Sequence, residues 1–457
     1  MSLTLNYQAI NKMIRSYGIL FILAFLSSFT VLSQRYQAIT SGVAWFDQNN
    51  KEVNAHGGCV VKEGDKYYLF GEYKSDTINA FSGFSCYSST DLINWTFEKI
   101  VLPVQKDGLL GPSRIGERVK VMKSPSTGEF VMYMHCDDLK YNDPHVGYAT
   151  SKTINGDYQF QGDLLHNGKY LRKWDLGTFK DTDGKGYLLT HEGFIYELSK
   201  DYKSVKNIVV SDIAKGGESP AMLKSKDLYY WLFSNKTSWE RNDNYYLTSK
   251  NLAGPWENKG TFAPEGSLTW NSQCSFVFPL ITNAQDTLHI YMGDRWSYPR
   301  QGSAATQVWL PVSIENGKMS VPRFLESWYP DNNGYQLTAF NDRPTDNNRF
   351  VSNEKGTSIT VPFKGRRIAI KGISKNTGGY ARVTLKNKKN DLIINTIVDF
   401  YSKIEIESLK FVSPLLPINN YMVTIEVMGE HGVWYKKDGT QFGSTDNYIT
   451  INDLLFE

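Results

Sequence analysis

The stretch Gly216-Gly217-Glu218-Ser219-Pro220-Ala221-Met222-Leu223 leads, after a short charged turn, into the apolar run Leu228-Tyr229-Tyr230-Trp231-Leu232-Phe233. Two glycines let the backbone bend sharply, and a proline after Glu-Ser keeps the chain extended. The stretch therefore predicts that Glu218 is fixed at the entrance of a strand, with aromatic side chains just downstream. A carboxylate in that position is placed to donate a proton in a cleft.

The same arrangement occurs five times along the chain. Each unit has a marked entrance, an apolar strand, a charged turn, a strand rich in Tyr and Phe, and a third strand that often ends in Tyr-Ser or Tyr-x-x-Ser. No long stretch has a helical period, so the sequence predicts an all-β chain. The units begin at Gly57, Glu117, Asp175, Glu218 and Gln273.

Five repeats of about 40–60 residues, built from short strands, predict a five-bladed β-propeller over residues 43–330. The first strand of each blade lines the channel of a propeller, so the five entrances should converge. They carry His56, Glu117, Asp175, Glu218 and Gln273. Carboxylates that meet at one axis raise one another's pKa, which favours a functional site. For any single one of these residues, a solvated surface position is the alternative.

The repeated pattern ends after Pro330. There, Asp331-Asn332-Asn333-Gly334 and Asn341-Asp342-Arg343-Pro344 predict a linker and turns. Strands without the repeated phrase follow at residues 357–361, 367–370, 381–385, 421–427 and 448–451. They predict a β-sandwich over residues 340–457. This domain could bind carbohydrate through Trp434 or Tyr435, or brace the propeller. We favour the brace, because the sequence gives no obvious aromatic platform.

Composition and the first residues bear on partners and location. The 457 residues carry a net charge of +3 with mixed signs, which argues against nucleic acid or a membrane surface as the main partner. Lys12 and Arg15 precede an apolar run over residues 17–32, which predicts a signal peptide over residues 1–33. We therefore expect an exported protein, periplasmic or secreted, that is monomeric and has no membrane span in its mature chain.

The cysteines and histidines show no metal-binding spacing. Cys59, Cys86, Cys136 and Cys274 lack a C-x-x-C pattern and are interpreted as small buried hydrophobic residues, although a Cys59–Cys86 bridge stays open. A lone histidine such as His56 is typical of a structural position. The chain has no oxygen-rich calcium loop, so a structural calcium ion has no support in the sequence and no cofactor is expected to be required.

The five entrances together resemble those of glycoside hydrolase family 43, and most closely its exo-β-1,3-galactanase branch. The resemblance covers roughly residues 43–330 and rests on five short motifs in blade order. They read Ala55-His56-Gly57-Gly58, Glu117-Arg118-Val119-Lys120-Val121, Asp175-Leu176-Gly177-Thr178-Phe179, Glu218-Ser219-Pro220-Ala221-Met222 and Ser272-Gln273-Cys274-Ser275-Phe276-Val277.

This resemblance implies an inverting hydrolase that releases galactose from β-1,3-galactan, the main chain of arabinogalactan. Inversion needs an acid and a base about 6.5–9.5 Å apart. Glu218 matches the family's acid, with a pKa raised by burial and by neighbouring carboxylates. Asp175 matches the residue that tunes and orients this acid.

The base is where the sequence departs from the wider family. Most members place an Asp at the first entrance, where this chain has Asn54-Ala55-His56-Gly57. In the galactanase branch the water-activating role falls to a glutamine, which matches Gln273. Glu117 is the more conventional base chemically, and by resemblance it binds sugar hydroxyls. We favour Gln273 as the water-positioning group and Glu117 as a binding carboxylate.

Four further residues are predicted to bind the sugar. Glu72 and Tyr141 match the pocket of the family, whereas Arg295 and Trp296 are chosen for their chemistry, as a hydroxyl donor and a stacking face. Ordinary roles in turns, at the surface or in the core are the alternatives for each. Two other functions also stay open: an α-L-arabinofuranosidase or β-xylosidase of the same fold, and a non-catalytic carbohydrate-binding propeller.

Overall fold

The computed structural model describes residues 35–457 except 284–285, 339–342, 345–348 and 437, so the predicted signal peptide lies outside the described residues. The described chain is almost entirely β-structure, as predicted. Its helical elements are a 3-10 turn, η1 (Gly108–Leu110), and one short helix, α2 (Leu268–Asn271). Within this described part, no helix has both the length and the apolar character needed to cross a membrane.

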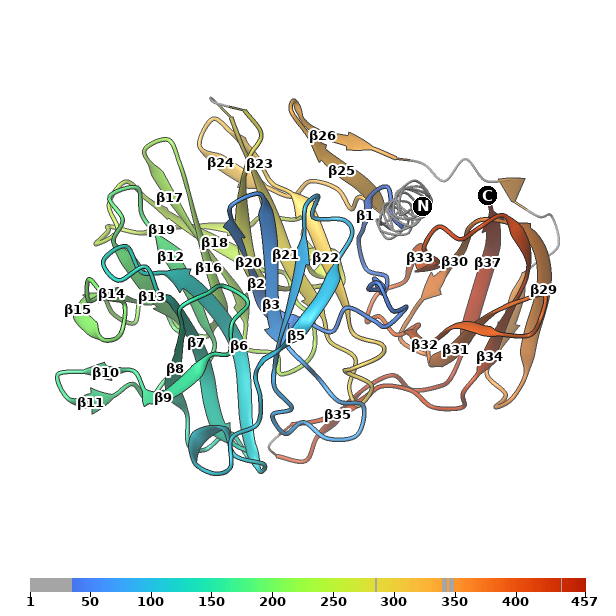
Figure 1. Cartoon of the computed structure of the whole chain (residues 1–457), viewed down its shortest axis with the longest axis horizontal. Helices are drawn as coiled ribbons and strands as arrows, with labels where there is room; N and C mark the ends of the chain where they lie inside the picture. The colour runs from blue at the N-terminus through green and yellow to red at the C-terminus, as the bar shows by residue number, and fades with distance from the viewer. Residues whose placement is uncertain (1–34, 284–285, 339–342, 345–348, 437) are drawn as a thin grey trace, which may run out of the picture. The chain divides into compact units, whose positions relative to one another are not determined.

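Five separate sheets follow one another along the chain (Figure 1). The first is β2 (His56–Glu63), β3 (Lys66–Glu72), β4 (Phe84–Ser89) and β5 (Thr96–Leu102), and the second is β6 (Arg114–Lys123), β7 (Phe130–Asp138), β8 (His145–Ser151) and β9 (Gln159–Asp163). The third contains β10 (Leu165–His166), β11 (Lys169–Tyr170), β12 (Leu176–Lys180), β13 (Gly186–Thr190), β14 (Phe194–Leu198) and β15 (Val205–Val210). The fourth is β16 (Gly217–Ser225), β17 (Leu228–Asn235), β18 (Tyr245–Ser249) and β19 (Glu257–Thr261), and the fifth is β20 (Gln273–Ile281), β21 (Thr287–Arg295) and β22 (Thr306–Pro311).

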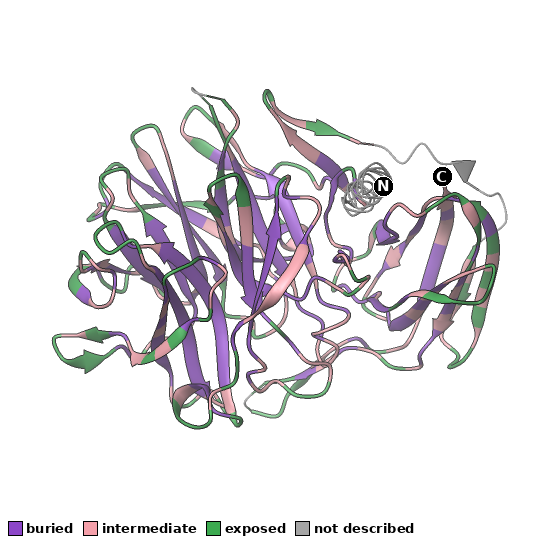
Figure 2. Ribbon diagram, in the orientation of Figure 1, coloured by how far each residue is buried: buried purple, intermediate pink, exposed green. Residues whose placement is uncertain are grey.

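Each sheet has the strand at its entrance residue along one edge, and these five edge strands, called the first strands below, are neighbours in space. β2 contacts β6, β6 contacts β12, β12 contacts β16, β16 contacts β20, and β20 contacts β2 again. These five strands are largely buried (Figure 2). This closed order of contacts brings together entrances that are far apart in the sequence.

A backbone irregularity recurs at these entrances. The pairing of β2, β6, β16 and β20 with the next strand shifts register directly after or next to the entrance residues His56, Glu117, Glu218 and Gln273. The left-handed φ angles of Arg118 (56°) and Ser219 (52°) lie inside two of these shifts. Because a bulge breaks the strict alternation of a strand, two consecutive side chains can turn toward the same side.

The C-terminal part forms two larger sheets. One contains β27 (Arg343–Pro344), β28 (Phe350–Ser352), β30 (Ile368–Ser374), β33 (Ile406–Val412) and β37 (Ile449–Phe456), and the other β29 (Ser358–Gly365), β31 (Tyr380–Asn387), β32 (Leu392–Asp399) and β34 (Asn419–Val427). Val383 of β31 pairs with Ile425 of β34, and Leu385 pairs with Val423. These four side chains are buried and alternate with more exposed neighbours, so one face of the sheet is in the core.

Short pairings and one aromatic contact lie between and beside the larger sheets. β1 (Ile39–Thr40) pairs with β25 (Ser327–Asp331), and β25 forms a hairpin with β26 (Gly334–Leu337). Asn332 and Asn333 form the turn of this hairpin, so the predicted turn is present there but joins two paired strands, and residues 341–342 lie outside the described residues. β23 (Ser313–Glu315) pairs with β24 (Lys318–Ser320). Phe46 packs edge-on against Phe411, with ring centroids 6.0 Å apart. All four cysteines are buried and free, so Cys59 and Cys86 are not bridged.

Candidate active site

A pocket of about 420 Å³ opens where the entrances meet. The structure brings most of the predicted site residues to its wall. They are Glu72, Glu117, Tyr141, Asp175, Glu218, Gln273 and Trp296. Four of these residues belong to first strands or stand next to one, and the other three lie at the end of a second strand or follow one, namely Glu72, Tyr141 and Trp296. This scatter explains why no single stretch of sequence contains the site.

Glu218 has the properties of a proton donor. Burial, and next the nearby charge of Asp175, raise the pKa of Glu218 to about 8, against opposing effects of Arg118, Lys236 and a hydrogen bond from Trp174. A carboxyl group with this pKa is protonated at neutral pH and can give its proton to a leaving oxygen. Glu218 pairs with Ser234 directly before the register shift of β16, and its side chain lines the pocket.

Asp175 is held by three hydrogen bonds beside Glu218. One carboxylate oxygen accepts from Nε of Arg118 at 2.7 Å, and the other accepts from the backbone N–H and the hydroxyl of Ser219, both at 3.1 Å. Ser219 follows Glu218 directly in the chain. Asp175 therefore anchors the segment that carries the acid as well as raising the pKa of the acid.

Arg118 links three of these groups, and the sequence analysis gave it no role. Besides Asp175, it donates from Nη2 to the Gln273 oxygen at 2.7 Å and from its backbone N–H to a Glu72 oxygen at 2.8 Å. Its Nη1 is buried without a hydrogen-bond partner among the described residues. In a regular strand Arg118 would face away from Glu117, so only the left-handed bulge brings both to the pocket.

The orientation of the Gln273 amide follows from its partners. Its oxygen accepts from Arg118 and from Nε1 of Trp296 at 2.8 Å, and its nitrogen donates to the Ser234 hydroxyl at 2.9 Å. Arginine and tryptophan side chains donate only, so the atom that faces them must be the oxygen. An imidic tautomer would place a hydrogen on that oxygen opposite two donors. This arrangement therefore holds Gln273 in the amide form.

A second charged group lies across the pocket. Nζ of Lys74 is 2.8 Å from a Glu72 oxygen and 3.0 Å from a Glu117 oxygen, and the Tyr141 hydroxyl donates to Glu117 at 2.9 Å. Burial alone would raise the pKa of Glu117, but Lys74 and His135 more than offset it and lower this pKa. Glu117 is therefore ionised at neutral pH and can accept hydrogen bonds from sugar hydroxyls.

Comparison with known proteins agrees with this geometry. Residues 53–266 match the family model described as "Glycosyl hydrolases family 43". A structure from Bifidobacterium bifidum s17, named as a candidate exo-beta-1,3-galactanase, is 38% identical, with a TM-score of 0.58, over 62% of this chain and 95% of its own. The chain belongs to glycosyl hydrolase family 43.

Three other matches differ in the share of this family 43 chain that they cover. An exo-beta-1,3-galactanase from Clostridium thermocellum is 26% identical over 90% of this chain and 87% of its own, with a TM-score of 0.59. The Phanerochaete chrysosporium exo-beta-1,3-galactanase, in complex with beta-1,3-galactotriose, shares the fold over 92% of this chain and 99% of its own, at 23% identity and a TM-score of 0.69. The curated Beta-xylosidase of Bacillus subtilis is 25% identical, and the match spans only 39% of that protein's length.

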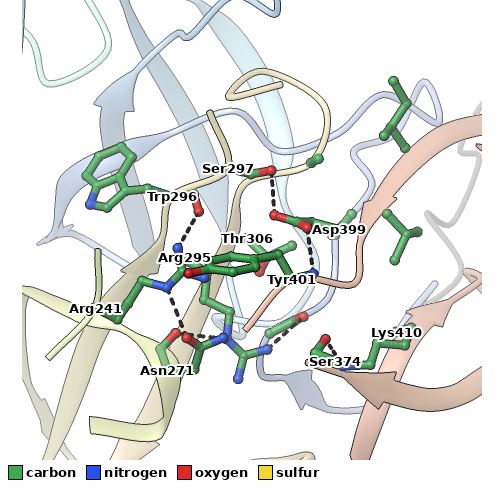
Figure 3. Close-up of a pocket in the computed structure, with 15 residues that line it drawn as sticks. Arg241, Asn271, Arg295, Trp296, Ser297, Thr306, Ser374, Asp399, Tyr401 and Lys410 are labelled. Atoms are coloured by element: carbon green, nitrogen blue, oxygen red, sulfur yellow. Dashed lines mark hydrogen bonds between the residues drawn. The ribbon is translucent and has the colours of Figure 1, made fainter. Parts of the chain in front are cut away.

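Two residues named from the sequence lie outside this pocket in the family 43 chain: Arg295, which was predicted to bind the sugar, and His56, an entrance residue that was interpreted as structural. Arg295 does not line the pocket: its guanidinium is buried in a separate cavity and donates to the backbone oxygens of Asn271, Gly42 and Trp270 (Figure 3). The Arg295 side chain therefore holds backbone segments of the fold together and cannot contact a sugar in the pocket. His56 is also buried, with Nδ1 3.5 Å from an Asp294 oxygen, and does not line the pocket.

Two aromatic side chains that the sequence analysis did not name, Trp174 and Trp239, form part of the wall. Trp174 stacks on His191 with ring centroids 3.4 Å apart, and Trp239 meets Trp296 edge-on at 5.5 Å. Tyr435, from the C-terminal part, also lines the pocket, whereas Trp434 is buried beside it. Among the described residues of this family 43 chain, no group of three or more His, Cys, Asp or Glu side chains is arranged to hold a metal ion.

Proposed function

We propose that this chain is an exo-acting glycoside hydrolase that releases galactose from β-1,3-galactan with inversion. The observation that carries the proposal is Glu218, protonated at neutral pH beside the anchored Asp175 in a pocket lined by hydroxyl-binding side chains. Support for the substrate comes from the 38% identical and 26% identical relatives, which are named as exo-beta-1,3-galactanases, the first as a candidate.

In the proposed reaction, Glu218 protonates the glycosidic oxygen while a water molecule attacks the anomeric carbon from the opposite face. The bond from the anomeric carbon to the leaving oxygen breaks, and the oxygen leaves with the proton of Glu218. The water oxygen forms the new bond and releases one of its protons to solvent, from which Glu218 is protonated again. Gln273 positions this water as an amide, with its nitrogen held at Ser234. A β-linked galactosyl unit leaves as α-galactose, and Glu117 and Glu72 bind hydroxyls of this unit.

The finer architecture is also a proposal. We interpret the five sheets whose first strands contact one another in turn as five propeller blades over residues 43–330. The two C-terminal sheets would then form a β-sandwich over residues 340–457. We also propose export to a periplasm or secretion, on the basis of the predicted signal peptide, and a monomeric mature chain that acts on arabinogalactan.

Separate substitutions should distinguish the roles of Gln273 and Glu117. We expect Gln273→Ala to lower kcat on β-1,3-galactan by about 10²-fold, because the attacking water is no longer positioned. Glu117→Ala should mainly raise KM, because it removes a hydroxyl acceptor. Steady-state kinetics on galactan measure both. If Gln273→Ala keeps most of the turnover and Glu117→Ala loses kcat, Glu117 is the base.

Hydrolysis should not need a metal ion. Glu218 supplies the proton and Arg118 supplies the positive charge at the centre of the pocket, so the proposed steps use only side chains. We expect the rate of galactose release to be unchanged after dialysis against a chelator, and unchanged again after adding back calcium. A loss that calcium restores would contradict this proposal.

A substrate panel tests the proposed function against its alternatives. Aryl β-galactoside, α-L-arabinofuranoside and β-xyloside are assayed beside β-1,3-galactan, and products are separated by size. Galactose released one unit at a time from the chain end supports the proposal. Release of a pentose supports an arabinofuranosidase or xylosidase, and binding of galactan without products supports a non-catalytic propeller.

A further inference from the structure

The C-terminal part reaches the catalytic pocket through one hairpin. β35 (Val433–Tyr435) pairs with β36 (Gln441–Gly443), and successive side chains of such a strand point to opposite sides. Trp434 is 1% exposed and stacks on Phe442 with centroids 5.7 Å apart. Tyr435 is 62% exposed and lines the pocket. A buried tryptophan thus holds a hairpin that presents a tyrosine to the pocket mouth.

Residues 236–240 contact both the pocket and the C-terminal part. Lys236, Ser238 and Trp239 line the pocket. Glu240 accepts a hydrogen bond from the hydroxyl of Tyr401 in the C-terminal part at 2.5 Å, and Trp434 also packs on Tyr401, at 5.4 Å between centroids. The pocket wall and the hairpin therefore share Tyr401 as a common support.

Arg241 completes the link to the centre of the pocket. Its guanidinium lies 5.5 Å from the Tyr401 ring and 5.9 Å from the Trp434 ring, and it donates to the Asn271 side chain and to the Trp296 backbone oxygen, both at 3.0 Å (Figure 3). Trp296 in turn donates to Gln273. This series of contacts fixes the position of the hairpin against the residues of the proposed reaction.

The burial of the side chains that line the pocket indicates which sugar unit Tyr435 would contact. Glu72, Glu117 and Gln273 are 2%, 8% and 6% exposed, so the unit that is cleaved off binds at the buried end. In an exo-acting enzyme the rest of the chain then extends toward solvent, on the side to which Glu218 gives its proton. Of the aromatic residues that line the pocket, Tyr435 is the one whose side chain is largely exposed to solvent.

We propose that Tyr435 is a specificity-determining residue whose ring stacks on a galactosyl unit on the leaving-group side, so that the C-terminal part takes part in substrate binding. This inference rests on the proposed function. The face of galactose that carries C3, C4 and C5 hydrogens is apolar and suits an aromatic ring, and a tyrosine offers this area with little conformational entropy to lose. The C-terminal part is then more than the brace that the sequence favoured.

Two substrates separate this contact from the reaction itself. β-Galactosyl fluoride occupies only the buried end, whereas β-1,3-galactotriose also fills the leaving-group side. For Tyr435→Ala we expect the ratio of kcat/KM on galactotriose to kcat/KM on the fluoride to fall about tenfold. Tyr435→Phe keeps the ring and should keep the ratio. Tyr170→Ala, at an exposed tyrosine of β11 outside the pocket, is the matched control and should also keep it.

Each outcome has one interpretation, provided that melting temperatures show each variant to be folded. A ratio unchanged in Tyr435→Ala overturns the inference, and so does an equal loss on both substrates, because that would mean a general effect on the pocket. Tyr435→Phe behaving like Tyr435→Ala also overturns stacking. If the wild type releases galactose from neither substrate, the proposed function itself fails, and this result is distinct from all the others.

Discussion

Glu218→Gln is expected to lower the rate of galactose release from β-1,3-galactan by about 10³-fold, because a positioned general acid contributes about 10²- to 10⁴-fold. An amide has the shape of the carboxylic acid but no proton of comparable acidity to give to the leaving oxygen. The substitution also removes no buried charge at neutral pH, since burial and Asp175 raise the pKa of Glu218 to about 8. The variant should therefore stay folded.

The control for this prediction is binding. Calorimetric titration of Glu218→Gln with β-1,3-galactotriose should give an affinity close to that of the wild type measured under conditions of slow turnover, and an unchanged melting temperature. An active Glu218→Gln variant would remove this residue from the role of acid. A variant that neither binds nor melts cooperatively would instead indicate a structural role.

Asp175→Asn is expected to lower kcat by about 10²-fold, because misplacing an acid by about an ångström costs that much. Both oxygens of Asp175 accept hydrogen bonds, one from Arg118 and one from Ser219. An asparagine can accept with one atom only, and its amide nitrogen would face a donor. The segment that carries Glu218 then loses part of its anchor. Steady-state kinetics measure the loss.

The pH profile distinguishes this effect from simple damage. Glu218 must be protonated to act, so kcat/KM of the wild type should fall as pH rises through about 8. Asp175→Asn removes a negative charge that disfavours ionisation of Glu218, so this pKa falls and the alkaline limb moves to lower pH. It stays above the ordinary range for a glutamate, because burial is the larger cause and persists. An alkaline limb that does not move would contradict the proposed coupling.

The repeat in the sequence was enough to place the main residues of the site. Each entrance was recognisable from its glycine or carboxylate and from the strand after it, and the contacts of the first strands bring Asp175, Glu218 and Gln273 to one pocket. The all-β class follows from the alternating strands. These features are local, so a single sequence contains them.

The residues that the sequence analysis missed, placed wrongly or left open depend on features that are not local. Arg118 reaches the pocket only because its backbone is left-handed within a bulge, and the neighbouring residues do not predict this conformation. Arg295 stands directly before Trp296, which lines the pocket, but its guanidinium donates to three backbone oxygens of other segments. Tyr435 lies at the pocket because Trp434 and Tyr401 pack together across two parts of the chain, and no periodicity predicts that packing.

The central claim is that one pocket, with Glu218 as its acid, removes galactose from the end of β-1,3-galactan with inversion. Proton NMR during the first minutes of digestion tests it most directly, by following the anomeric signals of free galactose in wild type and Glu218→Gln side by side. We predict α-galactose as the first product of the wild type and no galactose signal above background from the variant. β-Galactose as the first product, internal fragments without free galactose, or equal rates from both proteins would contradict it.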